Sequence, residues 1–157
     1  MVTIDVHASY NSSQPMAAGQ FAAGKEVDAS MEYLLIIPGK LHGFNDYISA
    51  ERSNRYGGAQ MKKADQNIVI HCARKQLRGV KIESPVYMEY TWYESNRQRD
   101  KDNICAFGRK VIQDGLVNSG VLHGDGWKHI IGFSDKFEVD RENPRIEVLI
   151  KEAAENI

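Results

Sequence analysis

The chain has 157 residues, with 20 basic and 21 acidic side chains and a formal net charge of -1. A chain of this length forms one domain that buries roughly 70% of its unfolded surface, so it needs no metal or disulfide to fold. The near-neutral charge excludes a protein with a wholly basic surface, as in histone-like DNA binders, but it is compatible with a local basic groove.

Two cysteines are too few for an extracellular disulfide framework and lie in no zinc-binding spacing, which favours a reduced, cytoplasmic protein. No apolar run approaches the roughly 20 residues that span a bilayer, and the first residues lack the pattern of a secretion signal. We therefore expect a protein without a membrane partner.

Residues 1–30 are rich in Ala, Gly, Ser, Asn and Gln and show little periodicity. We interpret them as a leader or tail, followed by a domain over residues 31–157. An alternative is that Thr3 to His7 add a short edge strand.

The first predicted strand is the apolar run from Tyr33 to Ile37, which Pro38-Gly39 ends. A helix is then expected from about Ser49 to Leu77, with a Ser or Asp as its cap and Gly57-Gly58 as the point where it would break. Much of the exposed surface of this helix would be cationic.

Apolar and polar residues alternate between Val86 and Tyr93, which predicts a second strand with one buried face. The clearest helix follows RDKDN at residues 99–103, and Gly120 ends it. Its apolar stripe comprises Ile104, Phe107, Gly108, Val111, Ile112, Gly115 and Leu116. Two more strands are expected at about 129–133 and 145–150. The order strand, helix, strand, helix, strand, strand predicts a single α+β domain, a small mixed sheet packed with two main helices.

Asp100 and Asp102 are the first candidate site residues. At the end of a strand, residues two apart project to the same face, so both carboxylates would point to one place. Such a pair either shares a proton or holds a cation, and Mg²⁺ prefers carboxylate oxygens together with a phosphate. Asp125, in a Gly-Asp-Gly turn, is the candidate third acid, and Lys110 can stabilise charge on a phosphate oxygen.

Structural alternatives exist for the pair of Asp100 and Asp102 and for two other residues, His123 and Cys105. A DxD pair before a helix is often an N-cap with solvated charge, in which case Asp102 would cap the helix that starts near Ile104. His123 is more often a loop residue than a metal ligand. Cys105 lies on the flank of the apolar stripe, which indicates a core thiol rather than a nucleophile.

The sequence resembles the RusA family of Holliday junction resolvases of phages and prophages, from Leu35 to Ile150. The stretches that carry the resemblance are IPGKLHGFNDYISAERSNRYGGAQMKK, RQRDKDN, QDGLVNSGVLHGDGW and NPRIEVLI. The specific part is a basic run, then DxDN, then a helix with a Lys four residues before an Asp, then G-V-x-x-x-D.

The resemblance implies a Mg²⁺-dependent, structure-selective endonuclease that acts as a homodimer on branched DNA and cuts four-way junctions symmetrically, with Mn²⁺ as a substitute ion. It implies that Asp100, Asp102 and Asp125 bind metal and that Lys110 is the catalytic lysine. The implied DNA-binding residues are Arg97, Arg99, Lys101, Asn103 and Arg109.

Two departures from the family pattern bear on these roles. The helix has one extra turn before Lys110, so Arg109, which lies nearer the face of Asp102, is the alternative catalytic cation. Where many relatives carry two adjacent acids in the last loop, this chain has Gly124-Asp125.

The functional hypothesis is therefore phosphodiester hydrolysis at junctions in recombination and repair, in the cytoplasm of a bacterium or phage-infected cell. The basic segment would follow the phosphate backbone and supply affinity without sequence preference. The rival is a non-catalytic module that binds junctions or single strands. A structural phage protein is a third interpretation, with only the low net charge in its favour.

Overall fold

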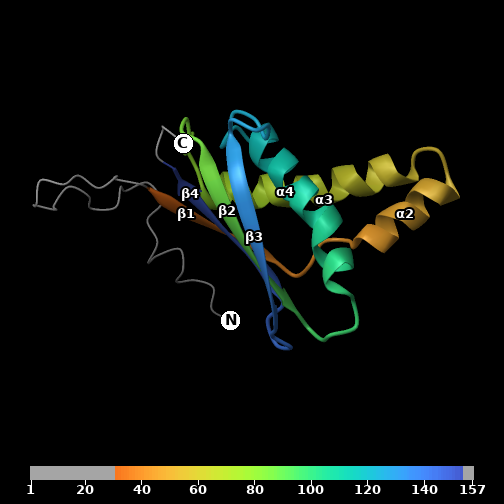
Figure 1. Ribbon diagram of the computed structural model, residues 1–157. Coiled ribbons are helices and arrows are strands. Elements are labelled where there is room, and N and C mark those ends of the chain that lie inside the picture. Colours follow the sequence, from red (N-terminus) through yellow and green to blue (C-terminus); the bar gives the residue numbers. More distant parts are fainter. Residues whose placement is uncertain (1–30, 154–157) are drawn as a thin grey trace, which may run out of the picture.

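The computed structural model describes residues 31–153, which form a four-stranded mixed sheet and three helices. The predicted α+β class is confirmed. In chain order the elements are β1 (Glu32–Pro38), α2 (Phe44–Ser53), α3 (Gly57–Gln76), β2 (Val86–Glu94), α4 (Lys101–Asn118), β3 (Ile130–Val139) and β4 (Arg145–Glu152). Figure 1 shows α3 and α4 on one face of the sheet, with α2 at the far end of α3.

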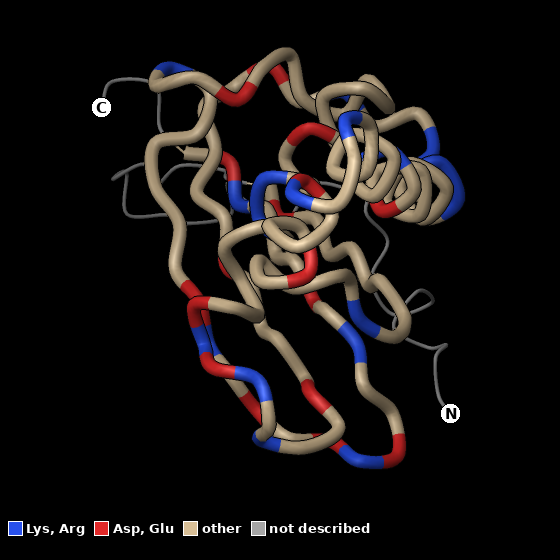
Figure 2. The backbone as a smooth tube through the Cα atoms, turned by 90° about the vertical axis from the view of Figure 1, so that its right-hand side faces the viewer, with Lys and Arg blue, Asp and Glu red and all other residues tan. Residues whose placement is uncertain are grey.

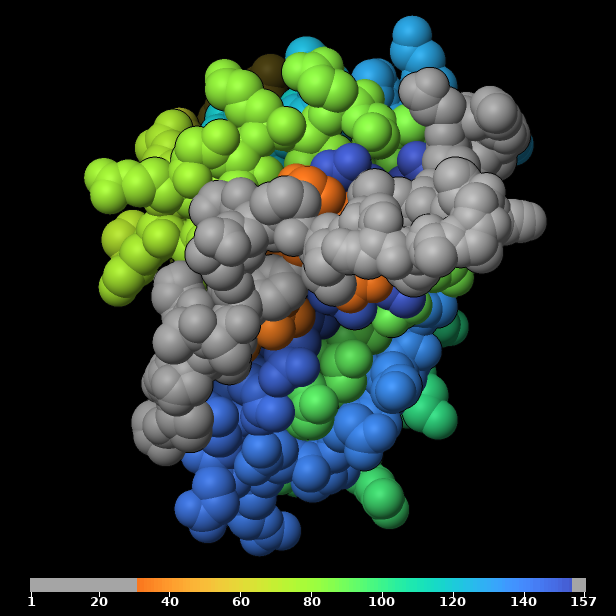
Figure 3. Space-filling view, turned by 90° about the vertical axis from the view of Figure 1, so that its left-hand side faces the viewer, coloured from red at the N-terminus to blue at the C-terminus, as the bar shows by residue number. Residues whose placement is uncertain are grey.

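The strands lie in the order β1-β4-β2-β3. Strand β4 runs antiparallel to β1 and to β2, whereas β2 and β3 are parallel. Because parallel neighbours need a crossover connection, α4 returns the chain from the end of β2 to the start of β3. Figure 3 views the sheet from the side opposite the helices, where β4, β2 and β3 appear side by side in dark blue, green and lighter blue.

The core lies between the sheet and the helices, and the sequence pattern predicts it well. The alternation in β2 buries Val86, Met88, Tyr90 and Trp92. The whole predicted apolar stripe of α4 is buried, and so is the thiol of Cys105. Burial raises the pKa of this thiol, which fits the expected core role.

The expected first helix is two helices, and its start and its break differ from the prediction. Helix α2 begins at Phe44, where the side chain of Asp46 accepts a hydrogen bond of 2.9 Å from the backbone N–H of Gly43. Ser49 therefore lies inside the helix rather than at its cap. The break comes at Asn54, whose backbone is extended. Gly57 then begins α3 so close to the carbonyl of Ala50 that a side chain would collide with it.

The expected leader at residues 1–30 and the alternative strand at Thr3 to His7 lie outside the described residues. No helix within residues 31–153 is both long and apolar enough to cross a membrane.

Helices α3 and α4 are in contact where Gly115 packs against Val69. A Cβ added to Gly115 would stand 2.7 Å from Cγ1 of Val69, which is fully buried. Alanine gains about 1 kcal/mol in helix propensity, but overpacking costs about 1–3 kcal/mol. We expect Gly115→Ala to lower the free energy of unfolding by about 1 kcal/mol in urea denaturation.

Ala106→Gly, on the exposed side of the same helix, measures the propensity term alone. Gly115→Ala gains the helix propensity that Ala106→Gly loses. The cost of overpacking is therefore the fall in unfolding free energy in Gly115→Ala plus the fall in Ala106→Gly. A gain in stability on Gly115→Ala would show that the two helices can separate here at no cost.

Candidate functional site

A hollow of about 930 Å³ lies where α4 begins. The carboxyl ends of β2 and β3 form one wall, because parallel strands end at the same edge of the sheet. The segment 96–104 and the first residues of α2 form the rest. Acidic and basic residues follow one another at the entry to α4, from Arg99 to Asp102, and in the turn between β3 and β4, from Asp140 to Glu142. Figure 2 shows acidic and basic residues interspersed along the backbone on this side of the molecule.

Asp100 and Asp102 both line this hollow. The expected strand-end geometry is wrong, because β2 ends at Glu94. Asp100 is instead the N-cap residue of α4, and Asp102 lies in its first turn. Both residues are exposed, and Asp100 makes no capping hydrogen bond through its side chain. Within residues 31–153 neither carboxylate has a hydrogen-bond or ion-pair partner. Asp102 is therefore not the cap, no capping bond is made, and both charges are solvated.

Two helix N-termini face the hollow. Helix α4 contributes its first turn, and α2 contributes Phe44 and Asn45. A helix N-terminus carries a partial positive charge and N–H groups without an intrahelical partner, which favours anions such as phosphate. At α2 the N–H of Asn45 is already taken by the side chain of Asn103. The hollow therefore combines two free carboxylates with a setting that attracts negative charge.

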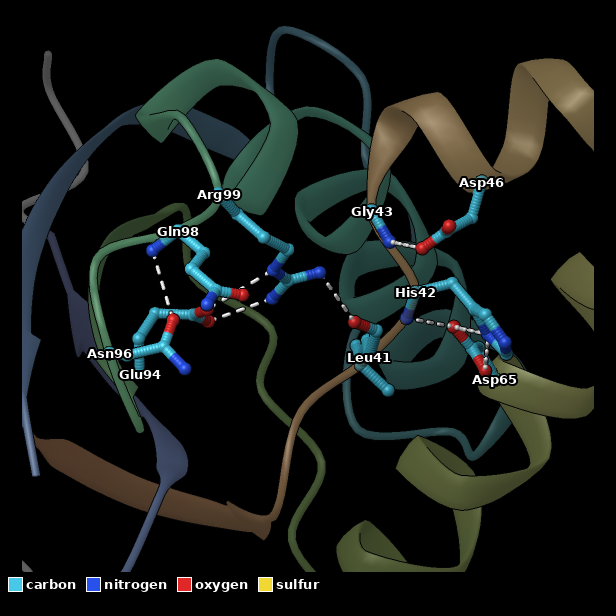
Figure 4. A network of polar contacts seen from close by, with 9 residues as sticks. All are labelled: Leu41, His42, Gly43, Asp46, Asp65, Glu94, Asn96, Gln98 and Arg99. Atoms are coloured by element: carbon cyan, nitrogen blue, oxygen red, sulfur yellow. Dashed lines mark hydrogen bonds and ion pairs between the residues drawn. The ribbon is translucent and has the colours of Figure 1, made fainter. Parts of the chain in front are cut away.

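Arg99 is held by a buried acid. Its Nε and Nη2 donate to the two carboxylate oxygens of Glu94 at 3.1 and 2.7 Å, and its Nη1 donates to the carbonyl oxygen of Leu41 at 3.2 Å (Figure 4). The side chains of Arg99 and Glu94 are only 17% and 7% exposed. This pair fixes the segment between β2 and α4. The guanidinium of Arg99 is therefore engaged within the protein and is not free for the DNA binding predicted for it.

Asn103 joins α4 to the start of α2. Its side-chain oxygen accepts a hydrogen bond of 2.8 Å from the backbone N–H of Asn45. A Cβ on Gly43 would stand 2.6 Å from the same oxygen, so the close approach needs glycine there. The Asn of the DxDN motif thus positions one helix N-terminus against the other.

Arg97 and Lys101 are the cations at the rim of the hollow. Both side chains are exposed, and neither takes part in an ion pair within residues 31–153. The ammonium of Lys101 lies 5.8 Å from the centre of the Phe137 ring. Among the predicted DNA-binding residues, Arg97 and Lys101 are therefore the two whose charged groups are exposed and unpaired within residues 31–153.

Asp125 does not reach the hollow. Its carboxylate lies 3.3 Å from Nζ of Lys110, and Lys110 is eight residues beyond Asp102 on α4, roughly 12 Å of helix rise. No group of three His, Cys, Asp or Glu side chains in residues 31–153 is arranged to hold a metal ion. The structure thus brings together Asp100 and Asp102, and separately Asp125 and Lys110, but not all four.

The second cluster is an ion-pair network on the helical side. Asp114 pairs with Lys110 at 3.2 Å and with Lys62 at 3.1 Å. Hydrogen bonds to Asp114 and Asp125 raise the pKa of Lys110. Burial alone would raise the pKa of Asp114, but the hydrogen bonds from Lys62 and Lys110 hold it below its ordinary value.

Arg109 points toward β3. Its Nη1 lies 2.7 Å from the carboxylate of Asp135 and its guanidinium lies 4.6 Å from the centre of the Phe133 ring. Asp135 also accepts a hydrogen bond of 2.9 Å from the indole N–H of Trp92. Arg109 is therefore occupied by a structural contact.

Sequence reasoning missed three acids that organise this region. Glu94 continues the buried alternation of β2, and Asp135 lies on the same face of β3 as Phe133 and Phe137. The period-2 pattern was therefore a usable signal for both acids. Asp65, 2% exposed, accepts hydrogen bonds from the backbone and ring of His42 (Figure 4). Nothing in the local sequence marks Asp65 as buried.

A scan against models of known protein families gives no match for this chain, and a search of curated proteins gives no significant match.

The contrast between Arg99 and Arg97 can be tested by stability. Arg99→Ala leaves the buried carboxylate of Glu94 without its cation, which costs about 3–5 kcal/mol in comparable pairs. Arg97→Ala removes an exposed charge and is expected to change the free energy of unfolding by less than about 0.5 kcal/mol. Both values come from denaturant unfolding of the full chain. Equal small losses in the two variants would contradict the structural role of Arg99.

Proposed function

We propose that the protein is a magnesium-dependent, structure-selective endonuclease that resolves four-way DNA junctions by symmetric phosphodiester hydrolysis, in recombination and repair. The observation that carries this proposal is the pair of exposed carboxylates, Asp100 and Asp102, in one hollow at two helix N-termini. Two neighbouring anions without a partner are typical of a place that receives a cation. The resemblance of the surrounding motif to RusA resolvases supplies the reaction and the substrate.

The donor set fits magnesium. Mg²⁺ is usually bound by one or two carboxylates together with waters and substrate phosphate, and Asp100 and Asp102 supply the two carboxylates. Mn²⁺, which also takes carboxylate oxygens, is the natural substitute. Such an ion, when bound, polarises the scissile phosphate and lowers the pKa of a bound water. The chain itself holds the carboxylates at the N-cap and first turn of α4, and it places the positive ends of two helix dipoles beside a phosphate.

Arg97 and Lys101 would contact the DNA backbone beside the hollow. Contacts of this kind give affinity without sequence information, and they weaken steeply as salt rises. Selection of a junction would then come from its shape. A homodimer suits a junction with two equivalent strands, because a two-fold axis presents the same hollow to both scissile phosphates. The substrate places the protein in the cytoplasm of a bacterium or of a phage-infected cell.

Asp125 and Lys110 take a different part in this proposal than the family pattern implies. They pair with each other roughly 12 Å along α4 from Asp102. At that distance from the carboxylates Lys110 would meet a phosphate that flanks the scissile one, exchanging its ion pairs with Asp114 and Asp125 for that contact. We therefore assign it to DNA binding and leave the chemistry to Asp100 and Asp102.

One observation favours the rival function, a junction-binding module without catalysis. The third acid of the family pattern is neutralised by a lysine and is remote from the other two. A module of this kind would use the same basic rim to bind branched DNA and would cut none of it.

The two functions separate in a cleavage assay with a labelled four-way junction. We expect the wild-type protein with Mg²⁺ to produce paired, symmetric nicks that disappear in EDTA. Asp102→Asn keeps the shape and removes the charge of one carboxylate, so cleavage should fall at least about 100-fold while junction binding in a gel-shift assay stays within a few-fold. Binding without cleavage by the wild-type protein, under Mg²⁺ and under Mn²⁺, would instead establish the binding module.

The place of Lys110 is tested by separating binding from chemistry. We expect Lys110→Ala to weaken junction binding and to reduce the salt dependence of binding by about one phosphate contact, while kcat stays within a few-fold. Lys101→Ala, at the rim, is the matched control with a free cation of the same type. A fall in kcat of about 100-fold or more in Lys110→Ala alone would return the lysine to the catalytic site.

A further inference from the structure

Trp127 is the most exposed large apolar side chain in residues 31–153, with 97% of its surface open to solvent. The other tryptophan, Trp92, is 1% exposed and hydrogen-bonds to Asp135. Indole rings are normally largely buried, because their apolar area is the largest of any side chain. A ring left this open makes no contribution to the core, so its place on the surface calls for another role.

The loop that carries Trp127 is well built. The carbonyl of Gly126 accepts hydrogen bonds from the N–H groups of His129 and Ile130 at 2.9 and 3.0 Å, which closes a tight turn with Trp127 inside it. Before the turn, His123 pairs with Glu83 at 3.0 Å, and its ring stacks on His129 with centres 6.4 Å apart. The indole ring of Trp127 therefore projects from a turn whose backbone is held by hydrogen bonds.

The surroundings of Trp127 are polar and include a free cation. Lys128 is exposed and takes part in no ion pair within residues 31–153. Along the chain the ring is flanked by Asp125, Gly126 and His129 besides Lys128, so the turn itself supplies no apolar side chain next to it. Anchors of protein interfaces usually lie at the centre of an apolar patch that excludes water. A single flat ring beside a lysine instead matches a platform for one nucleobase and its phosphate.

We propose that Trp127 stacks on an unpaired nucleobase of branched DNA while Lys128 contacts the adjoining phosphate, an inference that rests on the proposed nuclease function. Every base offers a π face, so the contact selects unpaired structure and not sequence. The bases exposed at a branch point supply this ligand, whereas a closed duplex keeps its bases stacked on one another.

This contact lies away from the carboxylates. Trp127 lies in the connection between the C-terminal end of α4 and the start of β3, whereas Asp100 and Asp102 stand at the N-terminal end of α4. Figure 1 shows how α4 runs along the sheet between these two places. A helix of 18 residues is roughly 27 Å long, so the stacked base is several nucleotides from the scissile phosphate. Trp127 therefore acts on affinity and on the choice of substrate, and not on the chemical step.

The chain contains its own reporter for this contact, because it has only two tryptophans. On titration of the full chain with a four-way junction carrying unpaired thymines at its branch, without divalent ions, we expect the solvent-exposed component of the tryptophan emission to be quenched. Trp127→Phe should abolish the quenching, since the buried Trp92 remains as the only indole. A junction with abasic residues in place of the unpaired thymines should leave the emission unchanged.

Affinity provides the second readout. Loss of one base–aromatic stack corresponds to roughly 5- to 150-fold in binding, so Trp127→Ala should weaken junction binding by that factor while Trp127→Phe retains most of it. Tyr56→Ala is the matched control, because Tyr56 is an aromatic residue 60% exposed on the turn between α2 and α3. That variant should bind as the wild type does. In the Mg²⁺ cleavage assay, kcat of Trp127→Ala should stay within a few-fold.

The outcomes separate this inference from the proposed function. Cleavage of the junction with no quenching and no effect of Trp127→Ala overturns the stacking role and leaves the nuclease intact. Failure of the wild-type protein to bind any branched DNA overturns both. A blue shift of the Trp127 emission that grows with protein concentration in the absence of DNA overturns the stacking role as well, and assigns the ring to a second copy of the chain.

Discussion

The parallel pairing of β2 with β3 is the constraint on which the rest of the structure depends. It obliges the chain to return over the sheet through α4, and it sets the first turn of α4 at the edge where both strands end. The buried pair of Glu94 and Arg99 then holds the connection between β2 and α4 in one conformation. Because Asp100 directly follows Arg99, the place of the backbone that carries both carboxylates is set by the sheet topology and by this one ion pair.

Charged residues divide into those that hold the fold and those that remain available. The guanidinium groups of Arg99, Arg109 and Arg145 each pair with acids and are about one fifth exposed. Planar guanidinium groups suit such fixed, directional contacts. The charges of Arg97, Lys101 and Lys128 are exposed, and none of the three pairs with an acid within residues 31–153. A basic run in the sequence therefore overstates the number of cations that are free to meet DNA.

The sequence predicted those parts of the structure that repeat with a short period. Apolar residues repeat every two residues in β2 and about every 3.6 residues in α4. Each repeat indicates which face of the element is buried. The division of the first helix depended on a close contact between Gly57 and Ala50, which no period encodes. The placement of Asp125 beside Lys110 follows from the path of the chain between α4 and β3, which a local sequence pattern does not encode. The motif predicted one site made of Asp100, Asp102, Asp125 and Lys110. The structure instead places the first two in one group and the last two in another.

A hollow with two carboxylates has a further consequence for how its proposed ligands bind. Two acids on an exposed helix turn leave most of the coordination shell of a hard cation to water and to phosphate oxygens. The ion and the DNA then each supply what the other lacks, because the ion neutralises the repulsion between carboxylates and phosphate and the phosphate completes the shell. Thermodynamic linkage requires that each raises the affinity for the other by the same factor. Under the proposed function, occupancy by the ion and by DNA would therefore rise together, and hydrolysis would belong to the complex of protein, ion and DNA.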